Sequence, residues 1–368
     1  MKYLSLIASL FFLISVSAQS QQISISPVTE HSENNQNTFP VKNGVFSIHG
    51  NQFEIGGKTI INPASWSVAD AGGKFGFLEQ RGEIYLKSVD YNGVNLFEKP
   101  LEFFDPDDET VKVYQFDDGR LALRDNVANF TFVNPKGSQL FSVSNSSQSE
   151  YGERESQLAR DKNGRTVVLY NPVIAYGNQT GSQARLVFGD QDNLVFFDDV
   201  EREISYLDVS RDGAFITIIA ANGSDDQVLI FDRFGNEIYR LDVDYTFRGA
   251  VLSKGAQYLT VYSSGRVQAF EIPSGELMGS ASSQATIIYA AYQPEDETII
   301  ALGGSYDGQN ISNPTLTAVH LGRRELIREE IPYSISAYDV SQIAVERNGT
   351  GLYRLTGLNM HLDLSIQF

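Results

Sequence analysis

The sequence predicts an all-β fold, a propeller of four-stranded antiparallel blades, on three observations. From Val45 to the C-terminus, runs of five to eight residues alternate between apolar and polar side chains, bounded by Gly, Asn, Asp and Pro. No window shows the three- and four-residue apolar spacing of an amphipathic helix. A hairpin pattern also recurs at intervals of roughly 44 residues, a period typical of propeller blades.

The N-terminal residues predict export. Lys2 precedes an apolar run from Leu4 to Val16, too short to span a bilayer, and small residues precede Gln19. We therefore expect a signal peptide over 1–18 and a periplasmic or extracellular protein. Residues 19–43 are polar and are expected to form a mobile leader. Residues 44–368 are expected to form a single propeller domain.

The recurring hairpin consists of two alternating strands around a turn that contains Gly or a polar residue. Its seven copies begin at Ile84, Phe130, Ala184, Val228, Val267, Leu316 and Leu352. The turns are marked by Gly93, Gly137, Asp190, Gly235, Gly275, Gly322 and Gly357. The segment before each hairpin supplies two more strands, so the repeat favours seven blades, with six or eight as alternatives.

The clearest blade runs from Ile204. The stretch ISYLDV is expected to line the channel, and AFITIIAA, from Ala214, is expected to form a second strand covered on both faces. The hairpin from Val228 completes the sheet. Before the first of these hairpins, Val45–Ile61 forms one more, around Gly56 and Gly57. It either closes the ring by pairing with the C-terminal blade or forms the outer half of an eighth blade.

The stretch from Leu207 to Val243 resembles the blades of bacterial WD40-like propeller repeat proteins. The resemblance rests on a turn of the type S-x-D-G before the second strand, here Ser210, Asp212 and Gly213. It implies a propeller fold and a tendency toward binding.

Composition narrows the partners. The chain has no cysteine, which excludes disulfides, thiolate metal sites and lipid attachment through an N-terminal cysteine. A net charge of -18 and a pI near 4.6 argue against binding nucleic acid or anionic membranes, since phosphate is bound by Lys and Arg. After the signal peptide no apolar run is long enough to span a membrane, and we expect a monomer.

No residues are assigned to a catalytic, cofactor or metal site. Four histidines, His31, His49, His320 and His361, are dispersed, and the one tryptophan is Trp66. Acidic residues cluster at Asp105–Glu109, Asp117–Asp118, Asp198–Asp199, Asp225–Asp226 and Asp242 with Asp244. The first cluster is the candidate for calcium, which prefers oxygen ligands, although Asp and Pro also favour plain turns.

The sequence therefore favours a non-enzymatic binding or scaffold protein that engages a protein or glycan through loops at one end of the ring. The alternative is an enzyme acting on a polysaccharide or a phosphate ester, with a calcium-assisted site in the channel. A sensor domain of an envelope complex is a third hypothesis.

Overall fold

The structure is a computed structural model of the whole chain. It describes residues 21–27, 37–41, 44–49, 52–61, 63, 65–69, 73–101, 111–125, 127–144, 157–161, 163–175, 179–188, 192–222, 225–243, 245–306, 310–332, 335–336, 343–357 and 361–368. The expected signal peptide lies outside these residues.

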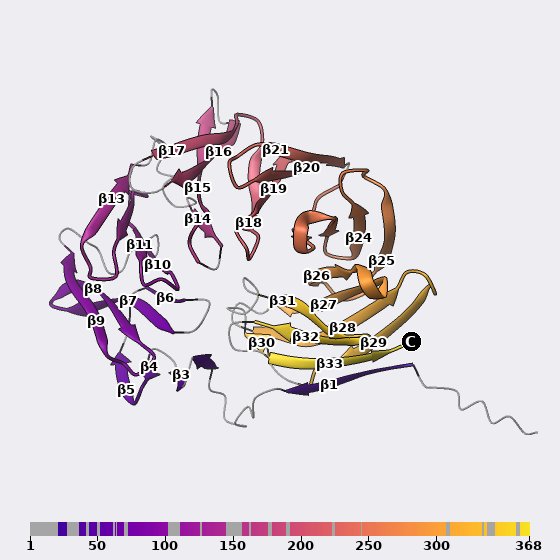
Figure 1. Cartoon of the computed structure of the whole chain (residues 1–368), viewed down its shortest axis with the longest axis horizontal. Helices are drawn as coiled ribbons and strands as arrows, with labels where there is room; N and C mark the ends of the chain where they lie inside the picture. The colour runs from indigo at the N-terminus through magenta and orange to yellow at the C-terminus, as the bar shows by residue number, and fades with distance from the viewer. Residues whose placement is uncertain are drawn as a thin grey trace, which may run out of the picture.

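The strands form eight antiparallel sheets arranged around a central axis (Figure 1). The first four sheets comprise β2 (Asn37–Val41), β3 (Gly44–His49), β4 (Gln52–Ile55) and β5 (Lys58–Ile61); β6 (Trp66–Val68), β7 (Lys74–Arg81), β8 (Glu83–Asp90) and β9 (Asn95–Leu101); β10 (Lys112–Gln115), β11 (Leu121–Arg124), β12 (Phe130–Val133) and β13 (Gln139–Val143); and β14 (Gln157–Arg160), β15 (Val167–Ala175), β16 (Gln179–Phe188) and β17 (Asp192–Asp199).

The other four sheets comprise β18 (Glu203–Val209), β19 (Phe215–Asn222), β20 (Asp225–Asp232) and β21 (Glu237–Val243); β22 (Gly249–Leu252), β23 (Tyr258–Tyr262), β24 (Arg266–Glu271) and β25 (Leu277–Ser282); β26 (Ile287–Gln293), β27 (Thr298–Tyr306), β28 (Asn310–His320), β29 (Glu325–Glu330) and β30 (Ile335–Ser336); and β31 (Ala344–Gly349), β32 (Leu352–Thr356) and β33 (His361–Gln367) with β1 (Gln22–Pro27). Two 3₁₀ turns, η1 (Lys254–Ala256) and η2 (Pro294–Asp296), lie between strands.

The predicted fold, a propeller of four-stranded antiparallel blades, is confirmed. Each of the seven predicted hairpins forms the third and fourth strands of a sheet, or β32 with β33 in the last sheet. Residues 45–61 belong to an additional sheet, β2–β5, as in the second alternative for that segment. The stretch AFITIIAA is buried on both faces, with Ile216, Ile218 and Ile219 each 0% exposed.

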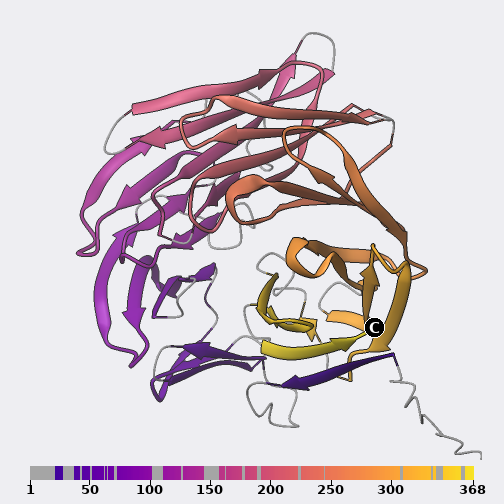
Figure 2. The same ribbon diagram turned by 45° about the vertical axis from the view of Figure 1, so that its right-hand side comes forward.

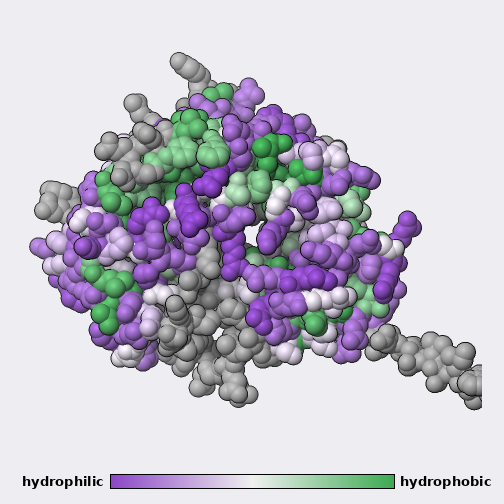
Figure 3. Space-filling view, in the orientation of Figure 1, coloured by the Kyte–Doolittle hydropathy of each residue, from purple (hydrophilic) through white to green (hydrophobic). Residues whose placement is uncertain are grey.

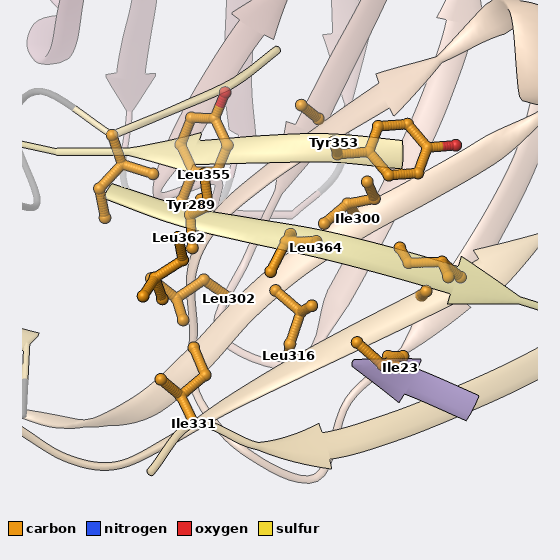
Figure 4. Close-up of a cluster of buried hydrophobic side chains, with 14 of the residues drawn as sticks. Ile23, Tyr289, Ile300, Leu302, Leu316, Ile331, Tyr353, Leu355, Leu362 and Leu364 are labelled. Atoms are coloured by element: carbon orange, nitrogen blue, oxygen red, sulfur yellow. The ribbon is translucent and has the colours of Figure 1, made fainter. Parts of the chain in front are cut away.

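Ring closure differs from the expectation. The segment Gln22–Pro27 falls in the polar leader predicted to be mobile, and that prediction is wrong here, because β1 pairs with β33 through all six residues. Ile23 is 3% exposed and lies among side chains of β28 and β33, as Figure 4 shows. Two isoleucines between serines are too few for hydropathy to reveal, but they suffice for a strand that covers one face of an existing sheet.

Hydrophobic clusters join each sheet to the next, from β2–β5 through to β31–β33. Hydroxyl groups make a second kind of link. Ser65, Ser182 and Thr260 accept hydrogen bonds from the backbone N–H groups of Val113, Ile204 and Tyr292, at 3.1, 2.9 and 2.9 Å. Each bond reaches the first strand of the following sheet, so the strands nearest the axis keep a fixed position (Figure 2).

Candidate functional site

The acidic clusters predicted from sequence are turn residues wherever the structure describes them. Asp118 pairs with Arg120 at 2.6 Å, and Asp199 accepts backbone hydrogen bonds from Glu201 and Arg202. Asp226 accepts one from Phe247. The calcium candidate, Asp105–Glu109, and Asp244 lie outside the described residues. In the described part of the chain, no three His, Asp or Glu residues come close enough to hold a metal ion.

The histidines and the tryptophan take structural positions or fall outside the description. His320 accepts a 3.3 Å hydrogen bond from the Arg323 backbone, and its ring meets that of Phe368 edge-on. Trp66 is half-buried against Phe75. His31 is not described, nor are the side chains of His49 and His361. Among the described residues, no helix is long and apolar enough to cross a membrane.

One group of polar side chains gathers at the axis instead. Asp208 and Tyr206 lie two residues apart on β18, so both side chains point to the same side of the strand. The Asp208 carboxyl interacts electrostatically with the hydroxyls of Tyr206, Tyr262 and Tyr289, which come from β18, β23 and β26. We call these four residues the channel cluster. Figure 3 shows an opening near the centre, lined mainly by hydrophilic residues.

Burial determines the protonation of the channel cluster. Asp208 remains exposed to water in the channel, although protein atoms enclose it on nearly all sides. This enclosure raises the pKa of its carboxyl to about 6, against a hydrogen bond from the Val209 backbone that lowers it. Burial also raises the pKa of Tyr206, Tyr262 and Tyr289, with smaller contributions from neighbouring charges. At neutral pH the cluster thus holds one carboxylate and three neutral phenols.

A cavity of about 230 Å³ adjoins the channel cluster between the first strands of two sheets. Its wall includes Leu158 and Ala159 of β14, Tyr170 of β15, and Ser205 and Tyr206 of β18. Tyr206 belongs to both the cavity wall and the channel cluster. Together they form a partly apolar recess beside a carboxylate.

A second candidate site lies on the outer hairpins. Phe188, Leu194 and Phe234 are 37%, 45% and 60% exposed, and we call them the rim surface. Leu194 pairs with Leu186 across β16 and β17, and a Cβ on Gly235 would lie 3.3 Å from that leucine. The turn that carries Phe234 therefore packs directly on the hairpin that carries the other two. Hydrophobic residues also gather over β15–β17 in Figure 3.

The turn that presents Phe234 is built like two others. In each, the first residue accepts hydrogen bonds from the backbone two and four residues later: Asp90 at 2.9 and 2.8 Å, Asn134 at 2.9 and 3.0 Å, and Asp232 at 2.8 and 2.9 Å. The position of Phe234 is occupied by Asn92 and Lys136 in the other two turns. The turn geometry thus does not require a phenylalanine.

Neither site was singled out from the sequence. Tyr206 and Asp208 were placed on a channel-lining strand, but their approach to Tyr262 and Tyr289 crosses three sheets. One signal was present: Ile204-Ser-Tyr206 and Ile287-Ile-Tyr289 each span a β-bulge at the same place in two sheets. For the rim surface, the signal was Phe in a turn position that is polar in the related turns.

No family model and no curated protein matches the sequence. Two solved structures are similar in fold. One is a eukaryotic initiation factor, with a TM-score of 0.47 and 11% identity over 84% of this chain and 92% of that chain. The other is the β-propeller domain of Myceliophteria thermophila Cps50 (Swd1), with a TM-score of 0.43 and 9% identity over 90% of this chain and all (100%) of that chain.

Proposed function

We propose that this chain is an exported, monomeric, non-enzymatic binding protein that docks a protein partner on the rim surface. The observation that carries the proposal is Phe234, a large apolar side chain that is 60% exposed on a rigid turn. Exposing an apolar side chain to water costs about 25 cal/mol per Å², which burial against a partner would recover. A propeller is also an architecture typical of protein-interaction scaffolds.

Two neighbouring features support a protein partner over a glycan. Leu194 and Phe188 extend the apolar area from Phe234 onto the next sheet, and aliphatic side chains offer a sugar few hydrogen bonds. Arg233 lies with its guanidinium 5.6 Å from the Phe234 ring, a pairing of aromatic and Arg typical of binding hot spots between proteins. Export is supported by the apolar run from Leu4 to Val16.

The related turns supply the variant for the test. Phe234→Lys reproduces the residue of the Asn134 turn and keeps every backbone hydrogen bond of the Asp232 turn. We expect the tagged wild-type protein to capture a partner from an extract of the native envelope. Capture by the variant should fall at least tenfold, since a central aromatic contact contributes about 2 kcal/mol or more.

Lys136→Phe is the matched control, because it places a phenylalanine in the equivalent turn of another sheet. It should leave capture of the same partner unchanged, and both variants should melt within a few degrees of the wild type. Equal capture by the wild type and Phe234→Lys would show that the partner docks elsewhere.

A further inference from the structure

The channel cluster encloses a carboxylate without an evident counter-charge. Among the described residues, Asp208 forms no ion pair with Lys or Arg, and its one hydrogen bond comes from the Val209 backbone. Its other neighbours are the phenols of Tyr206, Tyr262 and Tyr289, which stay neutral. A charge withdrawn from water in this way is stabilised by a cation.

The tyrosines are held in place by their surroundings. Tyr262 lies across from Gly249, where a Cβ would come within 2.3 Å of the tyrosine hydroxyl oxygen, so only glycine leaves room for this side chain. The oxygen of Tyr289 accepts a hydrogen bond from the Val345 backbone. The rings of Tyr262 and Tyr289 are 6.5 Å apart and inclined at 56°. The arrangement is therefore formed before any ligand arrives.

We propose that Asp208, Tyr206 and Tyr262 form a binding site for a primary ammonium group, such as the end of a lysine side chain or of an alkylamine. An ammonium group has three N–H donors and no acceptor. The carboxylate accepts one of them and carries the opposite charge, and the two hydroxyl oxygens accept the others. A calcium ion would require six to eight oxygen ligands, more than these three side chains supply.

The cavity beside Tyr206 suits the carbon chain of such a ligand. Leu158, Ala159, Ile204 and Leu207 contribute apolar surface to its wall, and its volume is about 230 Å³. An ammonium group at Asp208 can therefore be attached to an alkyl chain that leaves water. This favours an alkylamine over a small inorganic cation.

The test uses the purified full chain and n-pentylamine as the probe, with n-pentanol as its neutral analogue. Calorimetric titration at pH 7.5 should show saturable binding of pentylamine and none of pentanol. Asp208→Asn should weaken pentylamine binding at least tenfold, and Tyr262→Phe should weaken it several-fold. Glu203→Gln removes an exposed charge from the same strand and should leave binding unchanged.

The pH dependence gives a second readout. Asp208 is the group of the channel cluster that changes charge between pH 5 and 7.5, since its neighbours Tyr206, Tyr262 and Tyr289 titrate above that range. Affinity for pentylamine should therefore be about tenfold lower at pH 5 than at pH 7.5. Asp208→Asn should lose this dependence.

The site at Asp208 and the rim surface are separable. Phe234→Lys should bind pentylamine like the wild type, whatever happens to capture of the partner. Folding does not confound the test, because replacing an enclosed, uncompensated carboxylate with an amide should leave stability at pH 7 unchanged or higher. Equal affinity in the wild type and Asp208→Asn, or equal affinity at pH 5 and 7.5, would overturn the proposal.

Discussion

Asp296 connects the sheet β26–β30 to the last sheet of the ring through side-chain hydrogen bonds. Its carboxylate accepts bonds of 2.7 and 3.1 Å from the Arg347 guanidinium and one of 2.7 Å from the Tyr353 hydroxyl. Tyr353 itself is 1% exposed and lies in the cluster of Figure 4. The hydrogen bonds from Arg347 keep the pKa of Asp296 below its ordinary value, against the effect of burial.

The lowered pKa of Asp296 predicts a pH-dependent loss in the variant Asp296→Asn. At pH 7 the variant should unfold with a free energy lower by about 1–3 kcal/mol, the usual contribution of hydrogen bonds to a charged group. A carboxyl with a lowered folded pKa stabilises above its unfolded pKa of about 3.9, and this contribution disappears as the pH falls through the folded value. Urea unfolding at pH 7 and pH 3 measures the difference, which should shrink at pH 3.

Glu295→Gln provides the control for Asp296→Asn, because Glu295 is the exposed neighbour in the same turn. It should change the free energy of unfolding by less than about 0.5 kcal/mol. A difference between wild type and Asp296→Asn that persists unchanged at pH 3 would exclude the charged hydrogen bonds as its cause.

Among the elements, the outer turns explain why acidic residues and glycines recur in the sequence. The Asp232 side chain caps its turn, and Gly235 adopts a φ of +83°. A Cβ at Gly235 would lie 2.7 Å from the Cβ of Phe196 on the preceding sheet. The glycine therefore serves both the turn and the contact between blades. The sequence showed the turn and its period, whereas the contact with Phe196 became visible only once the sheets were placed.

Two glycines separate these two roles by substitution. Gly82 has a φ of +84°, almost that of Gly235, but no atom lies within 4 Å of its ideal Cβ. Gly82→Ala should cost about 1 kcal/mol through backbone strain alone. Gly235→Ala should cost about 2–4 kcal/mol, because overpacking is added to the same strain. Thermal or urea unfolding of both variants checks the order, and equal costs would contradict the contact with Phe196.

At the scale of the whole molecule, β1 joins the beginning of the described chain to its end. Its register with β33 runs from Gln22 opposite Gln367 to Pro27 opposite Leu362. Ile23 is the residue of β1 buried in the shared core. Closure removes an exposed sheet edge from β33, which would otherwise be open to pairing with other chains.

Ile23→Ala should therefore lower the stability of the ring by about 2–4 kcal/mol, through lost burial and the cavity left behind. The strand β33 should also lose protection in hydrogen exchange before the sheets on the opposite side of the ring. Ser24→Ala, an exposed change on the same strand, should have little effect. If both variants unfold at the same temperature, β1 does not contribute to closure.

The sequence by itself determined the all-β class, the period of the blades and the seven outer hairpins, because alternation and turn residues are local properties. It did not reveal closure by β1, since the edge that Gln22–Pro27 covers is more than 330 residues away along the chain. Only the tertiary structure brought Asp208 together with Tyr206, Tyr262 and Tyr289, and Phe234 beside Leu194. Such sites depend on the distance between blades, which no local pattern records.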